Sequence, residues 1–96
     1  MKLTQLQYFM CISECGSFTK AAEQLHITQP SLSKAIAELE VEAGTTLLLR
    51  TKSGVQLTQE GQIVLEQVRN ILRETDELSE MFWQMRQTYH TLKIGI

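Results

Sequence analysis

Apolar residues recur every three or four positions along most of the chain, which is the spacing of helices with one buried face. The first predicted helix runs from about Gln5 to Cys15. Thr4 and Gln7 have the spacing of a capping box at its start, and Gly16 supplies its end. Its predicted core face carries Leu3, Leu6, Phe9, Met10 and Ser13.

Two more helices are predicted over 17–25 and 29–43, joined by a short turn. Thr28 is a suitable N-cap for the second of them, and Pro30 is tolerated in a first helical turn, where no backbone donor is lost. Gly44 is its predicted terminator. The apolar positions of 29–43 fall on one stripe, which we expect in the core: Leu32, Ile36, Leu39 and Ala43.

Two short runs, 47–50 and 55–58, flank a polar turn that ends in glycine, which is typical of a β-hairpin. Thr58 is placed to cap the helix that follows. Two short helices joined by a tight turn and followed by a hairpin form a winged helix-turn-helix. The predicted fold is therefore mainly α, with three helices and a hairpin wing in a head spanning 1–58.

A long helix is predicted over 59–87, within a linker and dimerisation segment spanning 59–89. At about 43 Å it reaches beyond what a 58-residue head can cover. Its apolar residues follow the 3-4 spacing of a coiled coil, which predicts a dimer seam, although a longer domain covering the same stripe would explain it too. The proposed dimerisation residues are Val64, Val68, Ile71, Leu78, Phe82 and Met85. The alternation over 92–96 predicts a strand, so 90–96 is interpreted as the start of a further, C-terminal domain.

Charge and composition narrow the function only slightly. The 96 residues are 43% hydrophobic and 21% charged, as in ordinary globular domains. Residues 1–58 carry five basic and five acidic side chains, so the head is formally neutral, whereas nucleic-acid binders are usually basic. Three of its five cations, Lys34, Arg50 and Lys52, gather on the helix and wing that a groove would meet. No segment has the length of a membrane span or a signal peptide, so we expect a cytoplasmic protein.

Residues suited to catalysis or metal binding are few. No catalytic triad, paired carboxylates or phosphate loop occurs, so we do not expect an enzyme, a metal or a cofactor in this chain. Cys11 and Cys15, four apart on one helix, are interpreted as ordinary helix residues, because parallel side-chain directions make a bridge between them awkward. His26 is expected to pack in the turn.

The outward face of 29–43 is small and polar, which suits entry into a DNA major groove. Gln29 can pair with adenine through two hydrogen bonds, Ser33 can bond base edges, and Lys34 suits guanine or phosphate. The simpler interpretation is that these are polar residues favoured at a helix start and on a solvated surface. Arg50 has a structural alternative as well, as a bridge from the wing to a helix carboxylate.

Residues 3–61 of the chain resemble the LysR-type transcriptional regulators of bacteria. The similarity is carried by SFTKAA at 17–22, TQPSLSK at 28–34, Leu39-Glu40, and wing positions including Arg50-Thr51. It implies a homodimer with antiparallel linker helices, binding to partly palindromic promoter DNA, a possible higher oligomer of the full-length protein, and a small-molecule effector bound by the further domain. The DNA-binding residues expected from the helix and the resemblance together are Thr28, Gln29, Pro30, Ser31, Ser33, Lys34, Arg50, Lys52 and Ser53.

Three positions depart from the family pattern. Leu48 stands where the family usually has Phe, and Lys34 and Ser53 stand where it often has Arg. A lysine cannot reproduce the planar fork of an arginine, and Ser53 weakens the case for minor-groove reading by the wing. The alternative function is a winged-helix module that binds another protein, which the neutral head permits.

Overall fold

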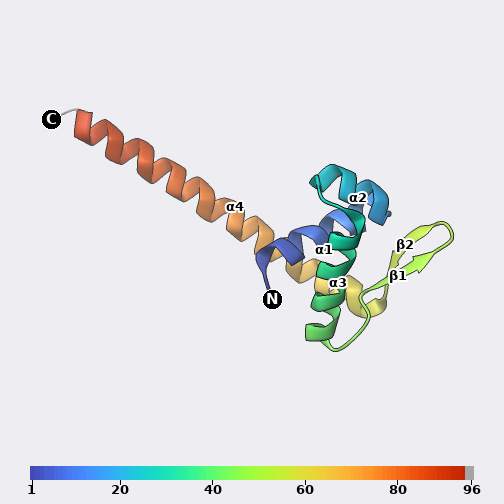
Figure 1. The fold of residues 1–96 in the computed structure, drawn as a ribbon. Coiled ribbons are helices and arrows are strands. Elements are labelled where there is room, and N and C mark those ends of the chain that lie inside the picture. The colour runs from blue at the N-terminus through green and yellow to red at the C-terminus, as the bar shows by residue number, and fades with distance from the viewer. Residues whose placement is uncertain (95–96) are drawn as a thin grey trace.

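The computed structural model describes the backbone of residues 1–94 and the side chains of residues 1–88. Its elements follow the predicted order: α1 (Leu3–Cys15), α2 (Phe18–Leu25), α3 (Gln29–Ala43), β1 (Leu48–Thr51), β2 (Gly54–Leu57) and α4 (Gln59–Ile94). Figure 1 shows α1–α3 gathered around the start of α4, the β1–β2 wing projecting on one side, and the rest of α4 extending away on the other. The winged helix-turn-helix prediction is confirmed.

The start of α1 differs from the prediction. The helix begins at Leu3 with Lys2 as its N-cap residue, two positions before the predicted start. The Gln5 side-chain oxygen accepts the Lys2 backbone N–H at 2.9 Å. Thr4 therefore lies inside the helix, and the predicted pairing of Thr4 with Gln7 is wrong. Gln5 replaces them because it lies three positions after the residue that actually precedes the helix.

The other helix ends in the head are as the local sequence predicts. Ser17 Oγ accepts the Lys20 N–H at 3.2 Å, and Thr28 Oγ1 accepts the Ser31 N–H at 3.2 Å, so each hydroxyl satisfies a free donor of its helix. α3 ends at Gly44 in the left-handed conformation. His26 also has a positive φ, 58°, and its side chain is exposed rather than packed in the turn.

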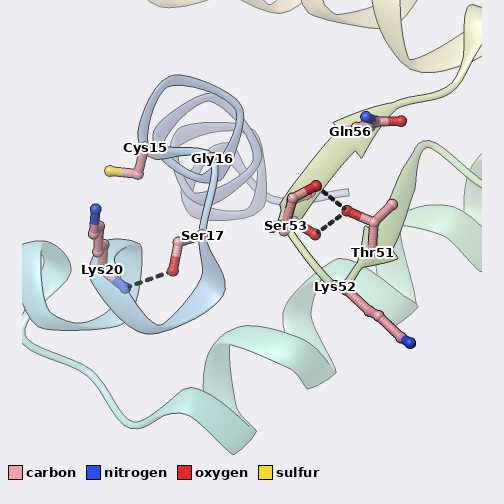
Figure 2. Close-up of a pocket in the computed structure, with 10 residues that line it drawn as sticks. Cys15, Gly16, Ser17, Lys20, Thr51, Lys52, Ser53 and Gln56 are labelled. Atoms are coloured by element: carbon pink, nitrogen blue, oxygen red, sulfur yellow. Dashed lines mark hydrogen bonds between the residues drawn. The ribbon is translucent and has the colours of Figure 1, made fainter.

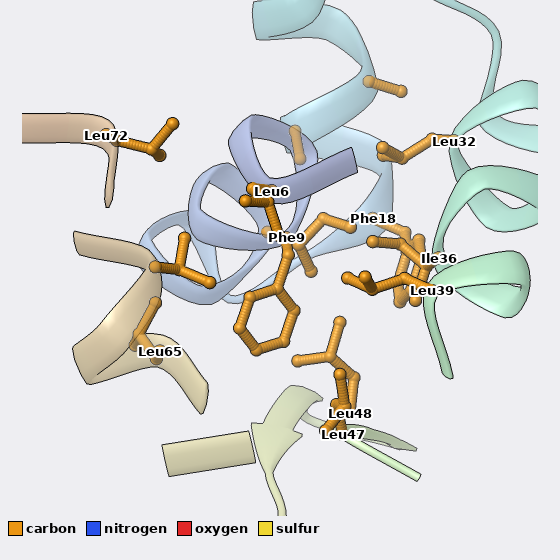
Figure 3. Packing of buried hydrophobic residues seen from close by; sticks show 14 residues of the cluster. Leu6, Phe9, Phe18, Leu32, Ile36, Leu39, Leu47, Leu48, Leu65 and Leu72 are labelled. Atoms are coloured by element: carbon orange, nitrogen blue, oxygen red, sulfur yellow. The ribbon is translucent and has the colours of Figure 1, made fainter. Parts of the chain in front are cut away.

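The core forms where α1 meets each of the other helices (Figure 3). Its largest fully buried side chains come from α1, α3, the loop before β1 and α4: Phe9, Ile12, Leu32, Leu47 and Val68. Ala43, predicted for the same stripe, is exposed at the end of α3. Leu3, predicted for the core face of α1, is 39% exposed, because the apolar face of that helix is centred on Phe9 and Ile12.

The wing is joined to the core at both of its ends. β1 and β2 pair antiparallel, with Leu48 opposite Leu57 and Thr51 opposite Gly54. At the entry, the Glu40 carboxylate of α3 accepts the backbone N–H groups of Leu47 and Leu48 at 2.7 and 3.1 Å. At the exit, Thr58 Oγ1 accepts the Gly61 N–H at 2.9 Å, the helix cap expected from the sequence.

α4 is longer than predicted and has two different halves. Its 36 residues run to Ile94, since neither glycine nor proline interrupts 62–94. The strand predicted over 92–96 is therefore wrong for 92–94, while 95–96 lie outside the described residues. The first half buries Leu65, Val68 and Leu72 against the head. At about 54 Å, the helix then extends well past the head. Among residues 1–94, no helix combines the length and apolar character that a membrane span requires.

Candidate nucleic-acid interface

The first turns of α3 present the proposed base-reading residues to solvent. Gln29, Pro30 and Lys34 are exposed, and Ser33 is half-buried. Thr28 and Ser31 are also exposed, but they bond each other: the Thr28 hydroxyl donates to Ser31 Oγ at 2.8 Å. Thr28 therefore caps α3, and the two hydroxyl groups are bonded to each other, in the absence of DNA. Gln29 and Lys34 are the long polar side chains that this turn projects outward.

Arg50 joins the wing to the helix-turn-helix. Its Nη2 donates to Ser33 Oγ at 2.5 Å, and its Cζ lies 3.7 Å from the centroid of the Phe18 ring. The sequence left open a bridge to a helix carboxylate. The partners found are instead a hydroxyl on α3 and an aromatic ring on α2, the latter in cation–π geometry. Arg50 thereby fixes the wing relative to α3, and Ser33 retains its own O–H to donate.

The wing tip is ordered by its own hydroxyl groups (Figure 2). Thr51 Oγ1 lies 3.2 Å from Ser53 Oγ and donates to the Gly54 carbonyl at 3.1 Å. Lys52 and Ser53 are both exposed. The tip therefore presents one cation and one hydroxyl group to whatever the wing meets.

A backbone contact that the sequence did not indicate holds the wing against the α1–α2 corner. The Val55 N–H donates to the Gly16 carbonyl at 3.0 Å. Gly54 has φ 134°, and a Cβ atom there would stand 2.5 Å from the Gly16 oxygen. The sequence identified these glycines only as a helix end and a turn. Their packing against each other depends on the tertiary fold.

A polar hollow of about 590 Å³ lies between this corner and the wing. Lys20 and Lys52 are among the residues that line it, on the α2 and wing sides respectively. Lys20 was not among the predicted DNA-side cations. Four of the five cations of residues 1–58 lie on α2, α3 and the wing, and four of the five acidic residues lie on α2 and α3 as well, so α2, α3 and the wing together carry no net charge.

The predicted dimer residues separate into two groups along α4: the first, Val64, Val68 and Ile71, lies beside the head, and the second lies beyond it. Val68 is 2% exposed in the head core, so it cannot also lie in a seam with a second chain, and that assignment is wrong. Val64 and Ile71 are half-buried beside an apolar hollow of about 380 Å³ that also involves Leu39 and Ile63. The second group is about half exposed, although large and apolar, and consists of Leu78, Phe82 and Met85. Met81, which widens the same stripe in the sequence, and Trp83, which the sequence did not single out, are exposed to the same extent.

Comparison with known proteins accords with this geometry. The model of the bacterial regulatory helix-turn-helix protein, lysR family, matches residues 3–62. The nitrogen assimilation regulatory protein nac of Klebsiella aerogenes is 48% identical over 77 residues, 80% of this chain and 25% of that protein. The hydrogen peroxide-inducible genes activator of Pectobacterium carotovorum subsp. carotovorum is 41% identical over 97 residues, all of this chain and 32% of that protein.

Solved structures agree with the sequence relatives. The BenM_DBD/catB site 1 DNA complex has a TM-score of 0.85 at 39% identity, covering 88% of this chain and 96% of that one. The CbnR_DBD–DNA complex has a TM-score of 0.79 at 35% identity, covering 83% and 92%. The chain spans about a quarter to a third of the length of the curated relatives given above. With the matched residues, the relatives and the fold in agreement, the chain belongs to the LysR family of bacterial regulatory helix-turn-helix proteins.

Proposed function

We propose that this chain is the sequence-specific DNA-binding part of a dimeric bacterial transcription regulator, with α3 entering the major groove. The observation that carries the proposal is the start of α3, where a narrow, polar face projects Gln29 and Lys34 away from the core. Two of the most similar solved structures are complexes of a related domain with DNA, which supports the same docking face. The activity proposed is binding without catalysis, in the cytoplasm, where bacterial promoters lie.

The side chains have distinct roles in this proposal. Gln29 reads a base edge, because a carboxamide can donate to and accept from adenine at once. Lys34 contacts guanine or phosphate. Lys20 and Lys52 contact phosphates on either side of the hollow under the wing. Arg50 positions the wing through Ser33, so its loss would disturb the orientation of the wing as well as remove a charge.

The dimer is proposed to form through the second half of α4. Leu78, Phe82 and Met85 follow the coiled-coil spacing and are about half exposed. A stripe of that size on a helix with no cover from its own head marks an interaction surface. A second copy supplies the same stripe, and two heads then meet two half-sites of a partly palindromic promoter. The proposed linker is followed by an effector-binding domain, consistent with the greater length of the relatives.

Replacing Gln29 with alanine is expected to reduce discrimination between the matched site and a site with the contacted base pair changed. The expected loss is about 1–3 kcal/mol, or roughly fivefold to more than a hundredfold in the ratio of the two dissociation constants. The measurement is a titration of both DNA duplexes at one fixed salt concentration. Gln62→Ala is the matched control, because Gln62 is an exposed glutamine on α4. An unchanged ratio in Gln29→Ala would remove Gln29 from base reading.

The second candidate, a module that binds another protein, is favoured by one observation, the equal numbers of basic and acidic residues in 1–58. Salt separates the two functions. Affinity for DNA falls steeply with added salt because phosphate contacts release bound counterions. A head whose binding to DNA does not change with salt, or that binds none, would favour the protein partner.

A further inference from the structure

The thiols of Cys11 and Cys15 lie in contact on the last turns of α1. Their Sγ atoms are 3.9 Å apart, and Cys15 Sγ also lies 3.0 Å from the Gln24 side-chain oxygen, to which it donates. Both cysteines are free and only half-buried. Cys15 lines the hollow beneath the wing, so a small solute can reach it. Residues four apart are neighbours on one face of a helix, so the backbone of α1 itself holds the two sulfur atoms close together.

The geometry favours a bridging atom over a direct disulfide. A disulfide holds its sulfur atoms at about 2.0 Å, roughly half the separation found here, and demands a specific dihedral angle. The parallel Cα–Cβ directions of a helix oppose that approach. An atom bound between the two sulfurs requires much less movement. Zinc is a poor candidate, because a structural zinc site uses four ligands and no cluster of three metal-binding side chains occurs among the described residues.

We propose that Cys11 and Cys15 form a binding site for trivalent arsenic compounds that carry two exchangeable oxygen ligands. Each thiol forms one arsenic–sulfur bond. With an organic arsenic oxide, both bonds between arsenic and oxygen break, and the oxygen leaves with the two thiol protons as one water molecule. Arsenic remains trivalent and the sulfur atoms are not oxidised, so the step needs no oxidant or reductant.

Protonation of the Cys11 thiol is compatible with this exchange. Burial, with the neighbouring Cys15 thiol and the Glu14 charge, raises the pKa of the Cys11 thiol to about 11. The thiol is therefore protonated at neutral pH, which disfavours reagents that attack a free thiolate. Arsenic exchange carries the thiol protons away in water, so its equilibrium does not require a stable thiolate at Cys11. One of the two arsenic ligands, Cys15, directly precedes Gly16, whose carbonyl accepts the Val55 N–H of the wing.

The test uses phenylarsine oxide, one molecule per chain, on the reduced 96-residue protein without DNA. After incubation with an excess of a monothiol such as 2-mercaptoethanol, intact-mass spectrometry measures the adduct that remains. The expected result is a single phenylarsenic group that resists the monothiol and is released by a 1,2-dithiol. Resistance requires both sulfur atoms, so Cys11→Ala and Cys15→Ser are each expected to lose it. Helical circular dichroism checks the fold of each variant.

A variant with two separated cysteines is the matched control. Cys11→Ser combined with Glu80→Cys keeps the number of thiols but places one on the exposed half of α4. It is expected to lose the adduct to the monothiol. The proposal is overturned if the unmodified protein also loses its adduct, or if the separated pair retains it equally well. Because the readout involves no DNA, failure here is distinguishable from failure of the DNA-binding proposal.

Discussion

Replacing Gly61 with alanine is expected to lower the free energy of unfolding by roughly 2–3 kcal/mol, the cost of forcing an extra group into a well-packed region. In a domain of this size that corresponds to a fall in melting temperature of about 10–20 °C. A Cβ atom at position 61 would stand against the Leu47 carbonyl oxygen, far inside any normal contact. The same oxygen accepts the Thr58 N–H, so the backbone cannot move away without losing the end of the wing.

The direction of the stability change in Gly61→Ala distinguishes tertiary packing from helix propensity. Helix propensity alone predicts that alanine in α4 stabilises the chain by about 1 kcal/mol. Gln62→Ala is the control, since Gln62 is exposed in the same helical turn and should change stability by less than about 0.5 kcal/mol. Thermal unfolding followed by circular dichroism measures both variants. A Gly61→Ala protein as stable as the parent would show that α4 does not pack against the loop before β1 as described.

Replacing Phe82 with aspartate is expected to dissociate the proposed dimer while leaving the head folded. Phe82 is 50% exposed in its own chain, so the substitution removes nothing from the core. An unpaired carboxylate buried in the seam costs at least about 3 kcal/mol, which raises the dimer dissociation constant more than a hundredfold. Sedimentation velocity at micromolar concentration measures the change. Ile71→Asp, at another dimer position predicted from the sequence, is less clean, because Ile71 also packs against the head.

Gln84→Asp is the matched control for Phe82→Asp. It adds the same charge to an exposed position two residues further along α4, on the other side of the helix from the stripe. It is expected to remain dimeric. Dimers of equal stability in all three proteins would place the interface elsewhere. A parent chain that is already monomeric at these concentrations would contradict the seam itself.

Elements with strong local signals were predictable from the sequence. The caps at Ser17 and Thr28 and the stop at Gly44 depend on side chains within a few residues, so the sequence predicts them well. The predicted start of α1 was wrong because Lys2 with Gln5 and Thr4 with Gln7 both have the three-residue spacing of a capping box, and the spacing does not choose between them. The alternation over 92–96 has the strand period, but only a few residues carry it, and helix α4 continues through 92–94.

Contacts between distant residues were not predictable. Nothing near Arg50 in sequence indicates that its partners are Ser33 and Phe18, because the wing must first fold back against the helices. The same holds for the Gly16–Val55 hydrogen bond. The heptad spacing in α4 predicts an apolar stripe, yet it could not show how far along the helix the head covers that stripe. Val68 lies on the covered side of that boundary, and Phe82 lies beyond it.

Selection of binding sites from a random DNA library tests the central proposal most directly. The chain is incubated with the library at low and moderate salt, and the bound fraction is sequenced over successive rounds. The proposal predicts one enriched, partly palindromic motif, with half-sites spaced for two α3 helices and with the preference at the base pair that Gln29 contacts weakened in Gln29→Ala. An unenriched pool, with no DNA retained even at low salt, would contradict DNA recognition by this head and favour a protein partner.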